Sequence, residues 1–207
     1  MNDVLKIFVQ LRNKAHNTGE NVGKLLAIST NEIPVSVFGM IFNKLTLGLE
    51  LLSHYYDAWG KKSNTKCLSV KEARQENAQR VIMIQRMIFV ETMSSIEFCT
   101  KEYIKKYPLK IGSFKNRIYL GGIMNRSKEQ GVILYSEFML WDGCIKLRNT
   151  LVHNNGFSEK TLECNYPNCK LNLQKNKMIQ GNLKLYPNII DWLLDSIKLW
   201  IIAINKK

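Results

Sequence analysis

Three polar residues in the C-terminal half of the chain, Arg148, Asn149 and His153, carry side chains suited to cleaving a phosphodiester. Cleavage of RNA without a metal needs a base for the 2′-hydroxyl, an acid for the leaving 5′-oxygen and positive charge beside the phosphorus. His153 suits the proton transfers because the ordinary pKa of histidine is about 6.5. Arg148 suits the phosphate, since its planar guanidinium stays charged. Asn149 could orient either side chain or bind a phosphate oxygen.

These three residues lie at the end of a predicted helix. A buried face is predicted by the apolar residues Leu140, Ile145, Leu147, Leu151 and Val152. The helix is expected to stop at N-N-G (154–156), because Asn and Gly adopt the left-handed conformation that ends helices. On an ideal helix Asn149 and His153 lie roughly 40° apart, whereas Arg148 and His153 lie roughly 140° apart. The three can meet on one ligand if the last turn loosens, or if a second copy of the helix faces the first.

A purely structural explanation of the same residues also exists. Arg and His are favoured in the last turn of a helix because both can be cationic near the negative end of the helix dipole. An Arg–His pair at a helix end is more often a capped surface than an active site.

The hexapeptide R-N-T-L-V-H at 148–153 resembles the Arg-x4-His motif of HEPN domains, which typically carry a polar residue directly after the Arg. The resemblance implies an α-helical, usually dimeric fold in which the two motif copies meet at the dimer interface. It also implies a metal-independent endoribonuclease that needs no cofactor, with Arg148, Asn149 and His153 as its catalytic residues. We therefore expect RNA as the substrate, a homodimer, and a defence or toxin–antitoxin setting with an antitoxin-like protein partner.

Two alternatives remain open at the level of sequence. The first is a non-catalytic HEPN-like module that binds nucleic acid or nucleotides, or acts as an adaptor. The second is a structural or regulatory dimer whose basic face contacts an acidic partner.

The net charge of the chain favours a polyanionic partner. Among 207 residues, 30 Lys and Arg stand against 17 Asp and Glu, which gives +13. An excess of this size favours nucleic acid or an anionic membrane. The abundance of Lys, Asn and Ile could instead reflect an AT-rich genome.

Basic residues concentrate between positions 101 and 117, which we predict to be a track for the phosphate backbone. The predicted nucleic-acid-binding residues are Lys101, Lys105, Lys106, Lys110, Lys115 and Arg117. A solvated helix end with Lys in its last turn explains part of the same pattern. The aromatic cluster at 54–59 could stack on bases, although packing explains such spacing more often.

The remaining pattern predicts an all-α fold, an antiparallel bundle of long helices with a small β-hairpin before the last helix, and the resemblance implies that this bundle is HEPN-like. S-V-K-E at 69–72 is a capping box that should start the longest helix. Pro and Gly residues mark the expected boundaries of the other helices. We predict long helices at 2–16, 35–59, 69–106, 130–155 and 187–205, and a shorter helical piece after the basic stretch that ends at about residue 124. A turn is expected at 18–23 and a hairpin insertion at 157–184. All of these elements belong to a single domain of residues 1–207.

Two acids, Glu91 and Glu97, lie in the apolar part of the longest helix. Glu97 has Lys101 four residues on, which indicates an ordinary surface pair. Glu91 has no basic residue at that spacing. It could therefore orient Arg148 from a neighbouring helix, or face solvent.

Other classes of protein find little support in the sequence. The apolar stretches at 35–52 and 186–204 are interrupted by charges, so we expect no membrane span and a cytoplasmic protein. Five scattered cysteines argue against a disulfide framework, and the C-x4-C pair of Cys164 and Cys169 lacks two further ligands for zinc. The nucleotide-binding G-x4-G-K-[ST], the zinc-protease H-E-x-x-H and the serine-hydrolase G-x-S-x-G motifs are not found.

Overall fold

The structure is a computed structural model that describes residues 2–57, 69–106, 111–112, 114, 117–179 and 181–205. It is mostly helical, with a two-stranded antiparallel hairpin before the last helix, as predicted. The elements are α1 (Asn2–Leu26), α2 (Ile33–Asp57), α3 (Val70–Lys106), α4 (Leu120–Glu129), α5 (Tyr135–His153), β1 (Leu162–Tyr166), β2 (Cys169–Leu173) and α6 (Leu185–Asn205).

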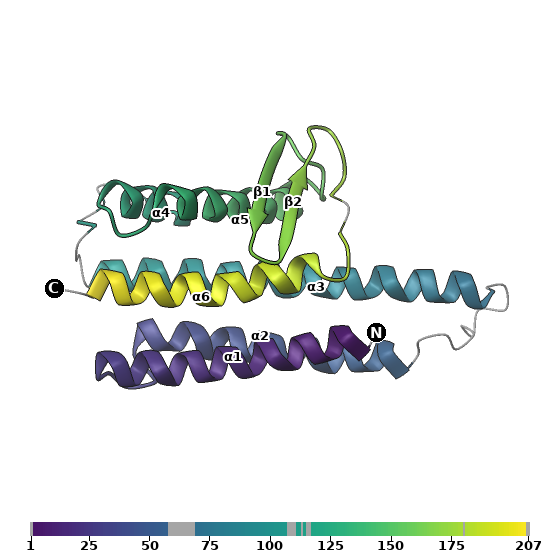
Figure 1. The fold of residues 1–207 in the computed structure, drawn as a ribbon, viewed down its shortest axis with the longest axis horizontal. Coiled ribbons are helices and arrows are strands. Elements are labelled where there is room, and N and C mark those ends of the chain that lie inside the picture. Colours follow the sequence, from purple (N-terminus) through teal and green to yellow (C-terminus); the bar gives the residue numbers. More distant parts are fainter. Residues whose placement is uncertain are drawn as a thin grey trace.

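The helices form three layers (Figure 1). α1 and α2 pack together on one side, α3 and α6 occupy the middle, and α4, α5 and the hairpin cover the other side. The N-terminal part of α3 extends beyond the rest of the bundle. Because α3 contacts α2, α4, α5 and α6, it connects all three layers.

Two predicted helix ends are confirmed. At the start of α3, the Ser69 backbone N–H donates to Glu72 Oε2 at 2.7 Å, and the Glu72 N–H donates to Ser69 Oγ at 3.3 Å. This reciprocal pairing is the capping box. At the end of α5, Asn155 and Gly156 adopt φ angles of 50° and 88°, and the Gly156 N–H donates to the Thr150 carbonyl at 2.9 Å. The left-handed pair stops the helix directly after His153.

The predicted turn at 18–23 is wrong, because α1 continues through it to Leu26. Gly19 and Gly23 are both buried, and they allow α2 to approach closely. A Cβ added at Gly19 would lie 3.1 Å from Cβ of Phe38. Packing against α2 therefore explains these glycines better than a turn does.

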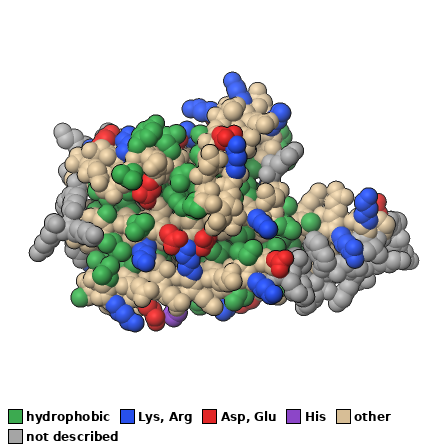
Figure 2. Space-filling model, in the orientation of Figure 1, with side chains coloured by type: hydrophobic (Ala, Val, Ile, Leu, Met, Phe, Trp, Pro, Cys, Tyr) green, Lys and Arg blue, Asp and Glu red, His purple; other side chains and the backbone are tan. Residues whose placement is uncertain are grey.

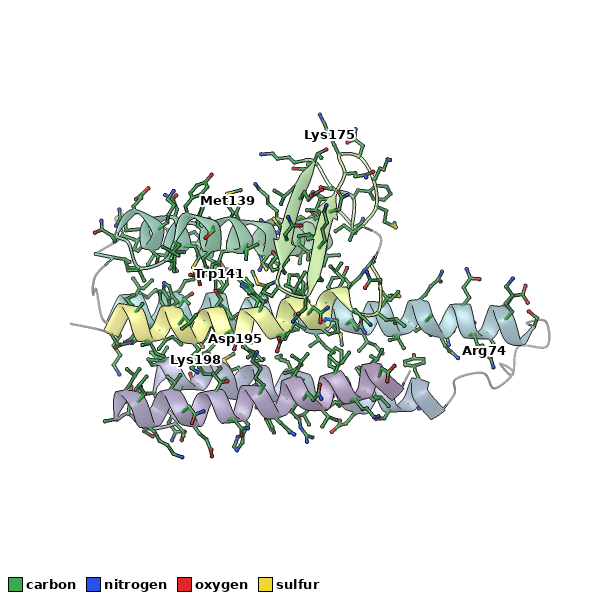
Figure 3. All side chains as sticks on the ribbon, in the orientation of Figure 1. Arg74, Met139, Trp141, Lys175, Asp195 and Lys198 are labelled. Atoms are coloured by element: carbon green, nitrogen blue, oxygen red, sulfur yellow. The ribbon has the colours of Figure 1, made fainter. Side chains whose placement is uncertain are left out.

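The largest buried side chains come from helices of all three layers, and they include Trp141, Trp200, Tyr186 and Phe38. Figure 3 shows Trp141 pointing from α5 toward the middle layer, whereas Met139 points away from it. Trp200 donates its indole N–H to Ser127 Oγ at 2.9 Å, which fixes α4 to α6.

The hairpin is seated on α5 and α6 through one face. Cys164, Tyr166, Leu171 and Leu173 on this face are buried. The Tyr166 hydroxyl donates to the Leu140 carbonyl at 2.8 Å, and Cys164 Sγ lies 3.7 Å from the Met139 carbonyl oxygen. The two thiols of the C-x4-C pair are therefore directed toward different helices, since Cys169 Sγ faces the Leu185 carbonyl of α6.

One described helix, over Ile33–Tyr55 of α2, is long and apolar enough to cross a membrane by length and composition. It packs against α1 and α3, as the core helix of a soluble protein also does.

Candidate functional site

Arg148 lies on the side of α5 that faces α3. Its Nη2 is 3.6 Å from Oε2 of Glu97, and its Nη1 donates to Oδ1 of Asn149 at 3.2 Å. The side chain is 26% exposed. Its Nε is buried and has no acceptor among the described residues. The guanidinium is therefore held in place at one end and retains an unused donor.

Glu97 is the centre of this arrangement, and it joins three elements. Its carboxylate pairs with Lys101 Nζ at 2.7 Å, with Arg148, and with the backbone N–H of Leu120 at the start of α4. The side chain is only 17% exposed. Burial alone raises the pKa of Glu97, but the pairing with Lys101, the charge of Arg148 and the Leu120 hydrogen bond outweigh it, so the pKa lies below its usual value.

The interpretation of Glu91 as the possible partner of Arg148 is wrong. Glu91 pairs instead with Lys44 of α2, at 2.9 Å. Positions 91 and 97 differ by roughly 120° around an ideal helix, so they face different neighbours. The predicted Glu97–Lys101 pair is confirmed. Because this pair already satisfies the carboxylate, the sequence offers no reason to expect the second contact of Glu97, with Arg148.

His153 is the last residue of α5, and its side chain is exposed. The Asn154 N–H still donates to the Thr150 carbonyl at 3.3 Å, so the helix is regular through His153. The last turn does not loosen. Within one chain, Arg148 and His153 therefore point to sides of α5 that differ by roughly 140°, with Asn149 exposed between them.

A cleft opens beside Arg148, between α3, α5 and the start of α4. Glu97, Tyr119, Arg148 and Asn149 line it, and its empty volume, open to solvent, is about 360 Å³. Tyr119 is 54% exposed. Lys101 Nζ and Arg117 Cζ lie 5.4 and 5.5 Å from the centre of its ring.

The predicted basic residues divide into three groups. Lys101 and Arg117 flank Tyr119 at the cleft. Lys105 pairs with Glu102 at 2.6 Å and Lys106 with Glu32 at 3.3 Å, so carboxylates already offset their charge. The other two predicted residues, Lys110 and Lys115, lie outside the described residues.

On the face of the molecule drawn in Figure 2, Lys and Arg side chains are interspersed with acidic ones, and several gather at the end of the hairpin farthest from the middle layer. Of the aromatic cluster at 54–59, the rings of His54 and Tyr55 pack edge to face at 5.4 Å, and Trp59 lies outside the described residues.

Sequence reasoning missed two features of the cleft. It did not predict the contact between Glu97 and Arg148, and it did not single out Tyr119. A usable signal for Tyr119 is its position two residues after Arg117, within the basic stretch and directly before the helix that starts at Leu120.

Among the described residues, no group of three His, Cys, Asp or Glu side chains is arranged to hold a metal ion. The chain matches no protein-family model, and no curated protein and no solved structure matches it either. The geometry of the cleft is therefore the main basis for assigning a function.

Proposed function

We propose that this chain is a metal-independent endoribonuclease of HEPN type that acts as a homodimer. The observation that carries the proposal is the constrained position of Arg148. Its guanidinium contacts Glu97 and Asn149 beside an open cleft, and the side chain remains 26% exposed. An arginine held in this way is preorganised for a phosphate, because little side-chain freedom remains to be lost on binding.

In the proposed reaction, the 2′-oxygen of a ribose attacks the adjacent phosphorus. One imidazole takes the proton of the 2′-hydroxyl, and an imidazolium gives a proton to the 5′-oxygen as the P–O5′ bond breaks. The products are a 2′,3′-cyclic phosphate and a free 5′-hydroxyl. Arg148 stabilises the charge that develops on the phosphorane oxygens. Asn149 lies next to both groups, and it orients Arg148 through the 3.2 Å hydrogen bond.

The regular end of α5 supports a site shared between two copies. Arg148 and His153 diverge around the helix of one chain, and a single histidine is poorly suited to both proton transfers. A second copy related by twofold symmetry supplies another His153 and another Arg148 to the same cleft. In this proposal both histidines act on one phosphate, one as base and the other as acid.

The first experiment incubates the purified protein with mixed RNA in EDTA, beside Arg148→Ala and His153→Ala. We expect cleavage by the parent and a loss of about 100-fold or more in each variant. His16→Ala is the matched control, since His16 is also an exposed helical histidine but lies on α1. His153→Ala protein that cleaves RNA as fast as the parent contradicts the proposal.

Mixed dimers test whether the site is shared. When parent and His153→Ala chains are co-refolded in equal amounts, a site that needs both histidines leaves about a quarter of the parent activity, whereas independent sites leave about half. Half activity therefore contradicts the shared site without contradicting cleavage itself.

One observation favours the alternative, a non-catalytic nucleotide-binding module. Within the part of the chain that the structure describes, no side chain orients His153. Catalytic histidines usually have such a partner. RNA binding that weakens with salt, without cleavage, supports this alternative.

A further inference from the structure

We propose that Tyr119 is a stacking platform for one unpaired base of single-stranded RNA, and that Lys101 and Arg117 bind the phosphate next to that base. The inference rests on the proposed function only for the identity of the ligand as RNA. It adds a recognition subsite beside the reacting groups, and it specifies an unpaired strand as the substrate.

The first argument is the environment of the Tyr119 ring. More than half of this side chain is exposed, at 54%. The contacts to its ring include the two cations Lys101 and Arg117. An exposed aromatic ring flanked by cations matches the way proteins bind single strands, in which bases stack on aromatic faces and basic side chains follow the backbone.

The second argument is that the platform has a fixed position relative to Arg148. The Glu97 carboxylate accepts the backbone N–H of Leu120, the residue directly after Tyr119, and it also pairs with Arg148. One carboxylate therefore links the start of α4 to the motif helix. A base on Tyr119 and a phosphate on Arg148 consequently belong to the same short stretch of strand.

The third argument is size. The cavity volume of the cleft that Tyr119 and Arg148 share is about 80 Å³, well below the roughly 300–1,000 Å³ usual for small-molecule sites. It is too small for a double helix, and only part of one nucleotide can enter it. Bases in a duplex are stacked on each other and cannot reach an aromatic side chain, so recognition of this kind selects unpaired RNA.

The two cations do not block the platform. A cation over an exposed ring contributes only about 0.5–1 kcal/mol; Arg117 is exposed, and Lys101 also pairs with Glu97 at 2.7 Å. When a base covers the ring, Lys101 and Arg117 can move to the phosphate that accompanies the base. There they form charge-assisted hydrogen bonds, which are stronger.

The test measures binding separately from cleavage, in full-length protein that carries His153→Ala so that the probes stay intact. The probes are a fluorescein-labelled single-stranded RNA of about ten nucleotides, the same strand in a blunt duplex, and an abasic strand of equal length. In this background Tyr119→Ala should weaken binding of the single strand by about 5- to 150-fold. Binding of the duplex and of the abasic strand should be unchanged.

Two variants serve as controls. Tyr119→Phe keeps the ring and loses the hydroxyl, so it should bind within about twofold of the background protein, since stacking uses the π-face. Tyr135→Ala removes a tyrosine of similar exposure, 67%, that lies about 20 Å along α5 from Arg148. It should bind RNA like the background protein.

The inference is overturned if Tyr119→Ala binds the single strand as tightly as the background does, if Tyr119→Phe loses as much as Tyr119→Ala, or if the background fails to bind the single strand. A parallel cleavage assay with His153 intact separates the two proposals. Binding that depends on Tyr119, without cleavage, rejects the nuclease and keeps the subsite. If Tyr119→Ala changes neither cleavage nor binding, and the parent cleaves RNA, the subsite is rejected and the nuclease proposal stands.

Discussion

At the scale of single residues, Glu97 controls the geometry of the cleft. A carboxylate near an arginine that binds phosphate competes with the ligand for positive charge. The Glu97 carboxylate is shared by Lys101, Arg148 and the backbone N–H of Leu120, so only part of its negative charge offsets Arg148. We interpret Glu97 as a positioning residue, because it acts on a ligand through Arg148.

The lowered pKa of Glu97 leads to a pH-dependent prediction. The unfolded chain binds the Glu97 proton more tightly than the folded one, so this carboxylate stabilises the fold at neutral pH, and the contribution is lost as the pH falls below 4.5 through the lower folded pKa. Glu97→Gln should therefore unfold about 2–8 °C below the parent at pH 7, and the gap should narrow at about pH 3.5. Thermal unfolding followed by circular dichroism measures both.

Glu91→Gln is the matched control, since Glu91 also pairs with a lysine but is 45% exposed. Exposed pairs contribute little, so its unfolding temperature should change by less than about 2 °C. A Glu97→Gln gap that is equally large at both pH values contradicts the assignment.

At the scale of elements, close contacts between helices decide where glycine is needed. Gly48 of α2 is buried against α3, and an added Cβ would lie 2.2 Å from Cδ1 of Ile88. Ile88 is itself 2% exposed, so it has no free space into which to move. Gly39 lies in the same helix, but an added Cβ there meets nothing within 4 Å.

This contrast predicts opposite effects of one substitution. Gly48→Ala should destabilise the protein by about 1–3 kcal/mol through overpacking. Gly39→Ala should stabilise it by about 0.5–1 kcal/mol, because alanine loses less backbone freedom in a helix. Urea unfolding measures both, and a Gly48→Ala protein as stable as the parent contradicts the α2–α3 packing.

The same comparison explains what the sequence could predict. Local signals, such as the Ser69–Glu72 capping box and the N-N-G stop, act within a few residues and were interpreted correctly. The glycines of 18–23 were misread because their neighbour, Phe38, is distant in the sequence. The contact between Glu97 and Arg148 was missed for a similar reason, since pairing across helices depends on helix rotation and on the docking of α5 against α3.

At the scale of the whole molecule, a net charge of +13 steers polyanions toward the protein without fixing where they bind. Lys105 and Lys106 each pair with a carboxylate of their own, whereas Lys101 and Arg148 share the single carboxylate of Glu97, which leaves one positive charge without an acidic partner there. The proposed contacts to phosphate reduce to Lys101, Arg117 and Arg148.

The number of phosphate contacts can be measured from salt dependence. Three contacts to a single strand predict that log K falls against log salt with a slope of about −2. Lys101→Gln should reduce the slope by about 0.7, whereas Lys175→Gln, just after the end of β2 and far from the helices (Figure 3), should leave it unchanged. A parent slope of about −6 instead indicates that the whole basic surface binds RNA.

The three-way contact of Glu97 also constrains how this protein can evolve. Lys101 and Arg148 both pair with the Glu97 carboxylate, so the effect of replacing one depends on whether the other is present. Such epistasis makes the acid the hardest member of the trio to replace. Homologues that no longer use the cleft should lose Lys101 and Arg148 before Glu97. The Glu97 carboxylate still accepts the backbone N–H of Leu120, the first residue of α4, when both cations are absent.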